Sequence, residues 1–150
     1  MMKIAIVGCT GLVGSEILKV LSEFKLPITK LILIASIKSI GKQVIFNNST
    51  LEVIGIQDAI NLKPNIAIFS AGGEISKKWA NKFTELGTTV IDNSSAWRMK
   101  KEIPLIVPEI NGGILTRNDK IISNPNCSTI QLVLALKNIH KQYGIKRLVI

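Results

Sequence analysis

The sequence contains few charged residues, few aromatic residues and few cysteines. Charged residues make up 19% of the 150 positions and aromatic residues 5%, and there are two cysteines and one histidine. Two cysteines are too few for the disulfide framework of a small secreted domain. The longest stretch without a charge, residues 121–136, includes Ser, Asn, Pro, Gln and Thr, whereas a membrane-spanning helix needs about 20 mostly apolar residues. The sequence therefore argues against a disulfide-rich scaffold and against a transmembrane protein.

Apolar residues are abundant, at 47% of the chain, and the formal net charge is +9. A chain of this length buries roughly two-thirds of the surface of its unfolded state, which is enough for a domain with a hydrophobic core. The basic residues form no cluster larger than a pair, as in Lys77-Lys78 and Lys100-Lys101, whereas nucleic-acid-binding domains usually gather positive charge on one face. The apolar run after Lys3 contains a glycine pattern and lacks a signal-peptide cleavage site. We therefore expect a cytoplasmic protein without a nucleic-acid partner.

Short apolar runs alternate with helical patterns, which is typical of an α/β protein with a doubly wound, mostly parallel sheet. The predicted strands are residues 3–7, 30–35, 66–70, 89–92, 105–107, 120–123 and 146–150, and the predicted helices are residues 12–24, 77–86 and 128–143. In the first helix, Val13, Ile17, Val20 and Leu21 form the expected apolar face. No turn or polar tail follows the strand predicted at 146–150, so we expect the chain to be a piece of a longer protein.

A run of three glycines separates the first predicted strand from the first predicted helix. It reads Gly8-Cys9-Thr10-Gly11-Leu12-Val13-Gly14. The first glycine permits a tight turn, the second lets the backbone approach a pyrophosphate, and the third lets the helix pack on the strand. The phosphates would then lie at the helix N-terminus. The pattern predicts a Rossmann-like dinucleotide site, with an ordinary glycine turn as the alternative; Cys9 is expected to be a small packing residue.

The residues after the second predicted strand indicate which dinucleotide binds. A cofactor with a free ribose 2′-OH is usually held by Asp or Glu about 20 residues after the glycines. Residues 35–42 contain no acid and instead carry Ser36, Lys38, Ser39 and Lys42. Hydroxyl and ammonium groups suit a 2′-phosphate, so the sequence favours NADP over NAD. The alternative is a solvated basic turn, because lysine is common on loops.

Cys127 lies in the segment Ser123-Asn124-Pro125-Asn126-Cys127-Ser128-Thr129, directly before the third predicted helix. The unpaired N–H groups and the dipole of a helix N-terminus favour a thiolate and can hold the oxyanion formed when it attacks a carbonyl. The alternative is a buried, inert cysteine. The one histidine, His140, is thirteen residues further along the same helix, or about 20 Å at the helical rise per residue. It is too far away to act as the base, which we therefore expect outside these residues.

These segments, in this order and spacing, resemble the aspartate-semialdehyde dehydrogenase family. The resemblance is carried by the glycine run at 8–14, ASIKSIGK at 35–42, Ser70-Ala71-Gly72-Gly73, DNSSAWR at 92–98, VPEIN at 107–111 and NPNCST at 124–129. It implies a two-domain, usually dimeric NADP enzyme that converts aspartyl 4-phosphate to aspartate 4-semialdehyde and inorganic phosphate, or the reverse, in lysine, threonine and methionine biosynthesis. Residues 1–127 would be the NADP-binding Rossmann-like domain. Residues 128–150 would be the first helix and strand of an incomplete α+β catalytic and dimerisation domain.

The resemblance also implies roles for individual residues, none of them a metal ligand. Cys127 would be the nucleophile that forms an acyl thioester, Asn126 its neighbour in the active site, and Arg98 a ligand of substrate or phosphate. Thr10, Gly11, Leu12 and Val13 would contact the pyrophosphate, Ser36 and Ser39 the 2′-phosphate, Ser70, Ala71 and Gly72 would line the cofactor cleft, and Asn93 would lie near the nicotinamide. The family's base histidine, a second arginine and a glutamine would follow residue 150. These residues alone are therefore expected to be inactive.

Two alternatives stay open. The nearest is a sister acyl-phosphate reductase, such as N-acetyl-glutamyl-phosphate reductase, which uses the same thioester chemistry; the Asn-Cys-Ser-Thr and DNSSAWR segments favour the aspartate enzyme. The other is a noncatalytic NADP-binding regulator on the same fold, which would need neither Cys127 nor Arg98.

Overall fold

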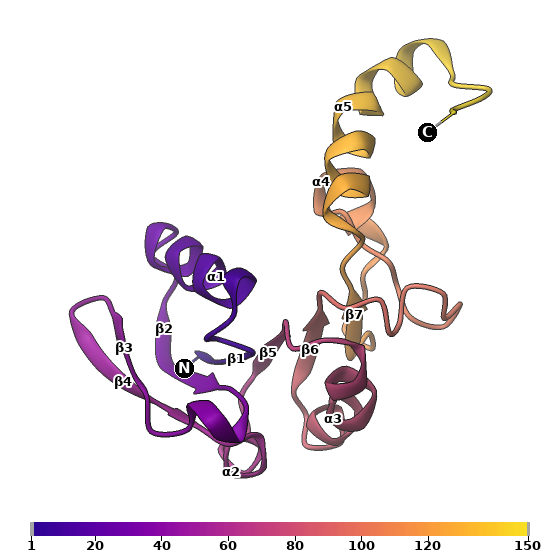
Figure 1. Cartoon of the computed structure of the whole chain (residues 1–150). Coiled ribbons are helices and arrows are strands. Elements are labelled where there is room, and N and C mark those ends of the chain that lie inside the picture. Colours follow the sequence, from indigo (N-terminus) through magenta and orange to yellow (C-terminus); the bar gives the residue numbers. More distant parts are fainter. Residues whose placement is uncertain (1, 150) are drawn as a thin grey trace.

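The computed structural model describes residues 2–149, and a seven-stranded sheet lies at its centre (Figure 1). The strand order is β3-β4-β2-β1-β5-β6-β7. The strands are β1 (Met2–Val7), β2 (Ile28–Ile34), β3 (Gln43–Phe46), β4 (Ser49–Ile54), β5 (Ile66–Phe69), β6 (Thr89–Asp92) and β7 (Ile121–Ser123). The helices are α1 (Leu12–Glu23), α2 (Ile56–Ile60), α3 (Gly73–Glu85), α4 (Pro108–Asn111) and α5 (Cys127–Tyr143), with 3₁₀ turns at Ile37–Ser39 and Gly112–Ile114.

All neighbouring strands except β3 and β4 pair in parallel. This confirms the predicted α/β class with a Rossmann-like, mostly parallel sheet. The antiparallel β3–β4 hairpin at the sheet edge was not predicted. Its turn is formed by Asn47 and Asn48, both with positive φ, and asparagine is among the residues that tolerate this conformation in two-residue hairpins. The Asn-Asn pair was therefore the signal for this hairpin.

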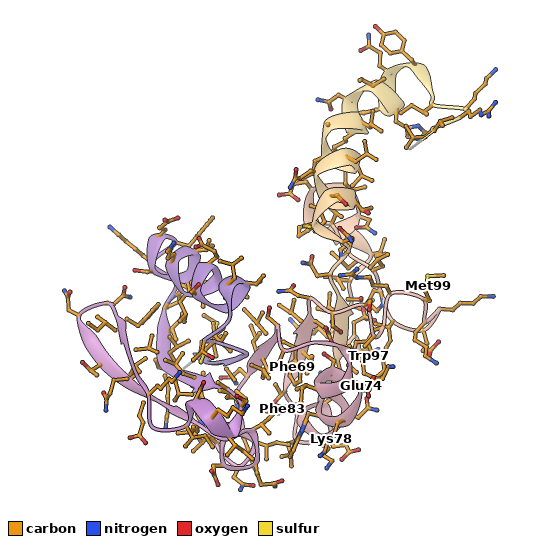
Figure 2. The ribbon with its side chains drawn as sticks, in the orientation of Figure 1. Phe69, Glu74, Lys78, Phe83, Trp97 and Met99 are labelled. Carbon is orange, nitrogen blue, oxygen red and sulfur yellow. The ribbon has the colours of Figure 1, made fainter. Side chains whose placement is uncertain are left out.

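Two hydrophobic clusters cover the two faces of the sheet. Alternate residues of β1 point to opposite faces, so that Ala5 and Val7 join one cluster and Ile4 and Ile6 the other. The first cluster lies against α2 and α3; in it the rings of Phe69 and Phe83 meet edge to face, with centroids 5.5 Å apart (Figure 2). The second lies against α1. Because both faces are covered, the last four residues of β1, Ile4–Val7, are all apolar and buried.

The apolar face predicted for the first helix is partly wrong. In α1 the buried residues are Gly14, Leu18 and Leu21, whereas Val13 and Val20 are 50% and 45% exposed. The close packing of Gly14 on the preceding loop sets which side of the helix faces the sheet. The predicted helix at 77–86 is also longer than expected: α3 begins at Gly73, four residues earlier.

The C-terminal part is built differently from the sheet. The strand predicted at 105–107 is reduced to a single bridge between Leu105 and Ser123. Helix α5 extends away from the sheet (Figure 1), touches α4 and contains no buried residue. Residues 146–149 form no strand, contrary to prediction, and Ile150 lies outside the described residues. In the part of the chain that the structure describes, no helix is long and apolar enough to cross a membrane.

Candidate active site

The predicted site residues gather where the parallel strands end, at the carboxyl edge of the sheet. The last residues of the parallel strands are in register, with Val7 paired to both Ile34 and Phe69, and Asp92 paired to Phe69 and Ser123. The segments that follow these strands therefore leave the sheet side by side at its carboxyl edge, where ligands bind in open α/β sheets.

The glycine loop, residues 8–14, owes its shape to backbone packing. Gly8 has a φ of +92°, and a Cβ added there would overlap the backbone carbonyl of Ser70. A Cβ at Gly14 would lie 2.8 Å from Cys9 Cα, so a side chain is excluded at both positions. At Gly11 the nearest heavy atom to an added Cβ is the Gly8 oxygen, at 3.4 Å. The space around Gly11 is therefore open to an approaching group.

The loop ends in the N-terminus of α1, which offers unpaired N–H groups. Gly11 is the N-cap residue and supplies no side-chain cap, and Ser15 N donates to Gly11 O at 2.9 Å. The amides of Leu12, Val13 and Gly14 consequently have no partner within the helix. Leu12 is 83% exposed and Thr10 is also exposed. An anion such as a pyrophosphate fits this end of the helix.

A cleft of about 840 Å³ begins at Gly8 and runs past the ends of β2, β4 and β5. Its lining residues are Val7, Gly8, Ile34, Ala35, Ser36, Ile37, Lys38, Ile40, Gly55, Ile56, Gln57, Asp58, Ala71, Ile75, Lys78 and Trp79. Ser36 and Ala71 are among the predicted site residues that line this cleft. Ser39 does not line the cleft: it is 8% exposed, and its amide donates to Ser36 O.

Six lining residues come from α2, which was not predicted, or from α3, which was predicted to begin four residues later than it does. They are Ile56, Gln57 and Asp58 of α2 and Ile75, Lys78 and Trp79 of α3. The ammonium group of Lys82 lies 4.6 Å from the centre of the Trp79 ring. Helix α2 has only five residues, too few for a periodic apolar pattern.

Ser70 and Gly72 complete this side of the edge. Ser70 N donates to Val7 O at 2.8 Å, which holds the segment after β5 against the glycine loop. Gly72, with a φ of +88°, is the N-cap residue of α3. Two helix N-termini and a glycine cradle thus meet beside a cleft large enough for a small molecule. The residues present fit a dinucleotide.

Arg98 joins the loops that follow β6 and β7. Its Nε donates to Asn124 O at 3.0 Å, and its Nη2 donates to Asn93 O at 2.9 Å. Asp92, which is fully buried, accepts a hydrogen bond from Ser94 N. A guanidinium carries five N–H donors, so Arg98 retains donors for a ligand. The arginine predicted to bind phosphate therefore also holds the loop that leads to Cys127.

Cys127 is the first residue of α5 and is exposed. Asn126 is the N-cap: its Oδ1 accepts from Ser128 N at 3.0 Å and from Ser128 Oγ at 2.9 Å, and lies 3.5 Å from the Cys127 sulfur. Ile130 N donates to Asn126 O. The amides of Cys127 and Thr129 are left without a partner in the helix. They can donate to a developing oxyanion.

The other thiol and the histidine are placed as predicted. Cys9 is 2% exposed, and burial raises the pKa of its thiol. It is a packing residue on the inner side of the glycine loop. His140 is exposed, and its Nδ1 accepts from Ile145 N at 3.1 Å near the end of α5. Among residues 2–149, no group of three or more His, Cys, Asp or Glu side chains is arranged to hold a metal ion.

The fold and this edge define a Rossmann-type dinucleotide-binding domain, and the helix that follows β7 begins with a cysteine on the carboxyl side of the same sheet. The family model described as the NAD-binding domain of semialdehyde dehydrogenase matches residues 3–116. The chain belongs to the semialdehyde dehydrogenase family, which confirms the resemblance seen in the sequence.

Individual relatives agree. The chain is 50% identical over 151 aligned residues to the aspartate-semialdehyde dehydrogenase of Aquifex aeolicus, covering 99% of this chain and 44% of that protein. The structure of aspartate semialdehyde dehydrogenase II from Vibrio cholerae complexed with ASA is 46% identical, with a TM-score of 0.93, and the match covers 98% of this chain and 49% of that one. The Candida albicans aspartate semialdehyde dehydrogenase with NADP is 24% identical (TM-score 0.75; 97% and 48% covered) and shares the fold. The chain thus spans about half the length of these proteins.

Proposed function

We propose that this chain supplies the cofactor-binding part and the nucleophile of an aspartate-semialdehyde dehydrogenase. The reaction would be the interconversion of aspartyl 4-phosphate and aspartate 4-semialdehyde, in the pathway to lysine, threonine and methionine. One observation is the main support for this proposal. The exposed thiol of Cys127 lies at a helix N-terminus on the same sheet edge as a glycine cradle for a dinucleotide.

NADP is the proposed cofactor, and when bound it would accept a hydride from the substrate. The amides of Leu12 and Val13 would hold the pyrophosphate, while Ala71 and Gly72 would border the cleft. Ser36 and Lys38 line the cleft after β2 and suit a 2′-phosphate. In our proposal Ser39 supports that turn through its backbone, since its side chain is buried.

The cofactor proposal is tested by Ser36→Asp. A carboxylate beside the 2′-phosphate should weaken NADP binding about tenfold, or about 1.4 kcal/mol, and leave NAD binding unchanged. Calorimetric titration of both cofactors measures the change. Equal affinity of the unmodified protein for NADP and NAD would overturn the assignment.

In the oxidative direction the Cys127 thiolate would attack the aldehyde carbon, forming a carbon–sulfur bond and an alkoxide. The unpaired amides of Cys127 and Thr129 would stabilise that oxygen. Loss of hydride from the carbon gives a thioester, and a phosphate oxygen then attacks the thioester carbonyl and releases the thiolate. The spare donors of Arg98 would hold the incoming phosphate through charge-assisted hydrogen bonds.

The remaining residues fit a larger enzyme. We propose that residues 128–150 begin a catalytic and dimerisation domain, because no residue of α5 is fully buried within residues 2–149 and apolar side chains such as Ile139 and Tyr143 are exposed. A general base would come from that domain, since His140 lies at the far end of α5. A homodimer is proposed on the resemblance to the family. A reducing compartment, the cytoplasm, fits an enzyme whose chemistry needs a free thiol.

Turnover of two semialdehydes tests the function. The natural gene product that carries this chain should oxidise aspartate 4-semialdehyde with NADP and phosphate, and N-acetylglutamate 5-semialdehyde far more slowly. Cys127→Ala should abolish turnover and leave NADP affinity within a few-fold. Cys9→Ala, which removes the buried thiol, is the matched control and should retain turnover. Ordinary turnover by Cys127→Ala would refute the thioester mechanism, and a preference for the N-acetyl substrate would favour the sister reductase.

A further inference from the structure

Asn124 makes three hydrogen bonds to the neighbouring loop, and each uses a different group. Its backbone N donates to Asp92 O at 2.8 Å, and its backbone O accepts from Arg98 Nε at 3.0 Å. Its side-chain Nδ2 donates to Asn93 Oδ1 at 2.9 Å. The two backbone bonds and the buried Pro125 fix the path of the chain toward Cys127. The side-chain bond is therefore not needed to fix that path, and it can serve a different purpose.

That side-chain bond determines which end of the Asn93 amide remains available. Because Asn93 Oδ1 accepts from Asn124, the Nδ2 group is at the opposite end of the amide. Asn93 is half-buried. Within residues 2–149 its Nδ2 atom has no hydrogen-bond partner and is accessible to solvent. It is a free donor directly after β6, next to the Arg98 guanidinium, which donates to the Asn93 carbonyl.

We propose that Asn124 is a positioning residue that orients the Asn93 amide so that an N–H donor faces the ligand. The ligand group must then be a hydrogen-bond acceptor oxygen. Two sources share this chemistry: a phosphate oxygen beside Arg98, and the carboxamide oxygen of a nicotinamide. The naming of these ligands rests on the proposed function, whereas the orientation of Asn93 does not.

Asn124→Asp tests the orientation most directly. The introduced carboxylate has no N–H to give to Asn93 Oδ1, so Asn93 would turn its Nδ2 toward that carboxylate and present an acceptor to the ligand. Asn124→Ala removes the bond but leaves Asn93 free to rotate. Both substitutions keep the backbone bonds at position 124. Asn118→Asp, an exposed site whose side chain makes no hydrogen bond within residues 2–149, is the control for the added charge.

Two measurements on the natural gene product report the effect. The first is KM for phosphate and for NADP alongside kcat; the second is the concentration of inorganic phosphate or of NADP that half-protects Cys127 from alkylation. We expect Asn124→Asp to raise one of these constants about tenfold with a smaller change in kcat, and Asn124→Ala to raise it about threefold. A rise in the phosphate constant assigns the donor to phosphate; a rise in the NADP constant assigns it to the nicotinamide.

A double variant separates orientation from direct repulsion by the new charge. In an Asn93→Ala background, Asn124→Asp should change neither constant further, because the residue through which it acts is gone. A full tenfold effect of Asn124→Asp in that background would overturn the proposal. So would an Asn124→Ala variant as impaired as Asn124→Asp, or Asn124 variants in which neither the phosphate constant nor the NADP constant changes. If the unmodified protein shows no turnover but the substitutions at Asn124 still shift the concentration that protects Cys127, the proposed function is refuted and the orientation of Asn93 stands.

Discussion

The glycine loop after β1 and the loops after β6 and β7 reach the same sheet edge, yet they are held in place by different forces. In the glycine loop the shape depends on absent side chains, since a Cβ at Gly8 or Gly14 meets backbone atoms. After β6 and β7 the shape depends on side chains that are present, because Asn93, Arg98 and Asn124 bond to one another across 31 positions of sequence. Close packing forms the glycine loop, and polar side chains position the segment that leads to Cys127.

The largest expected effect is on the glycine loop. Gly14→Ala forces a Cβ into the backbone of Gly8 and Cys9, and overpacking of this kind costs about 1–3 kcal/mol. Thermal unfolding should show a lower Tm. Gly11→Ala is the matched control, because its Cβ meets only one atom at 3.4 Å; it should keep the Tm and weaken NADP binding. Equal Tm values for both variants would contradict packing as the origin of the loop shape.

Arg98→Lys tests the network after β6 and β7. A lysine ammonium cannot bond both the Asn93 and Asn124 carbonyls in the geometry of a guanidinium. We expect the free energy of unfolding to fall by about 1.5 kcal/mol, which is near the low end for a hydrogen bond to a charged donor, because Arg98 is only half-buried. Phosphate affinity should fall while NADP affinity stays within a few-fold. A variant with normal phosphate affinity would remove Arg98 from the proposed phosphate site.

Asn126→Ala tests the N-cap that precedes the thiol. Loss of an N-cap side chain costs about 1 kcal/mol, and here it also removes the acceptor for the amide of Ser128. The rate at which Cys127 is alkylated at fixed pH should therefore differ from that of the unmodified protein. Asn138→Ala, on the exposed C-terminal half of α5, is the control and should leave that rate unchanged. Identical rates in both variants would mean that the cap does not affect the thiol.

The smallest effect is a pH response in the turn before β7. Hydrogen bonds from the Thr116 amide and hydroxyl lower the pKa of Asp119 from its ordinary value of 3.8. A lowered pKa means that this turn is stabilised above the ordinary pKa, and the stabilisation is lost as pH falls through the lowered value. Titration of the Thr116 amide signal by NMR should show its transition below pH 3.8. A transition at or above that pH would contradict the bonded geometry.

The contrast between the loops also explains what the sequence could predict. The glycine loop is a local pattern of seven residues, so its position between β1 and α1 could be predicted directly. The Arg98–Asn124 contact could not, because nothing local in either segment indicates that they meet; the register of β6 and β7 brings them together. Asp58 was missed because α2 is a single short turn of helix, and the burial of Ser39 because alternation within a loop has no fixed period.

The strands were predicted best inside the sheet, as in β1 and β6, each of which pairs with a strand on both sides. The strand predicted at 146–150 is wrong for residues 146–149, which form no strand, because apolar composition alone does not supply a pairing partner and none is present within residues 2–149. Helix α5 was predicted correctly, since its N-cap at Asn126 and its end at Gly144 are both local signals.

The most direct test of the central claim is the mass of the peptide that contains Cys127 after a single turnover. The natural gene product is mixed with aspartate 4-semialdehyde and NADP in the absence of phosphate, so that the thioester cannot be released to the acyl phosphate. We predict that NADPH forms in a burst and that the Cys127 peptide gains one β-aspartyl group, which added phosphate then removes. A burst of NADPH with an unmodified Cys127, or an acyl group on Cys9 instead, would contradict the account.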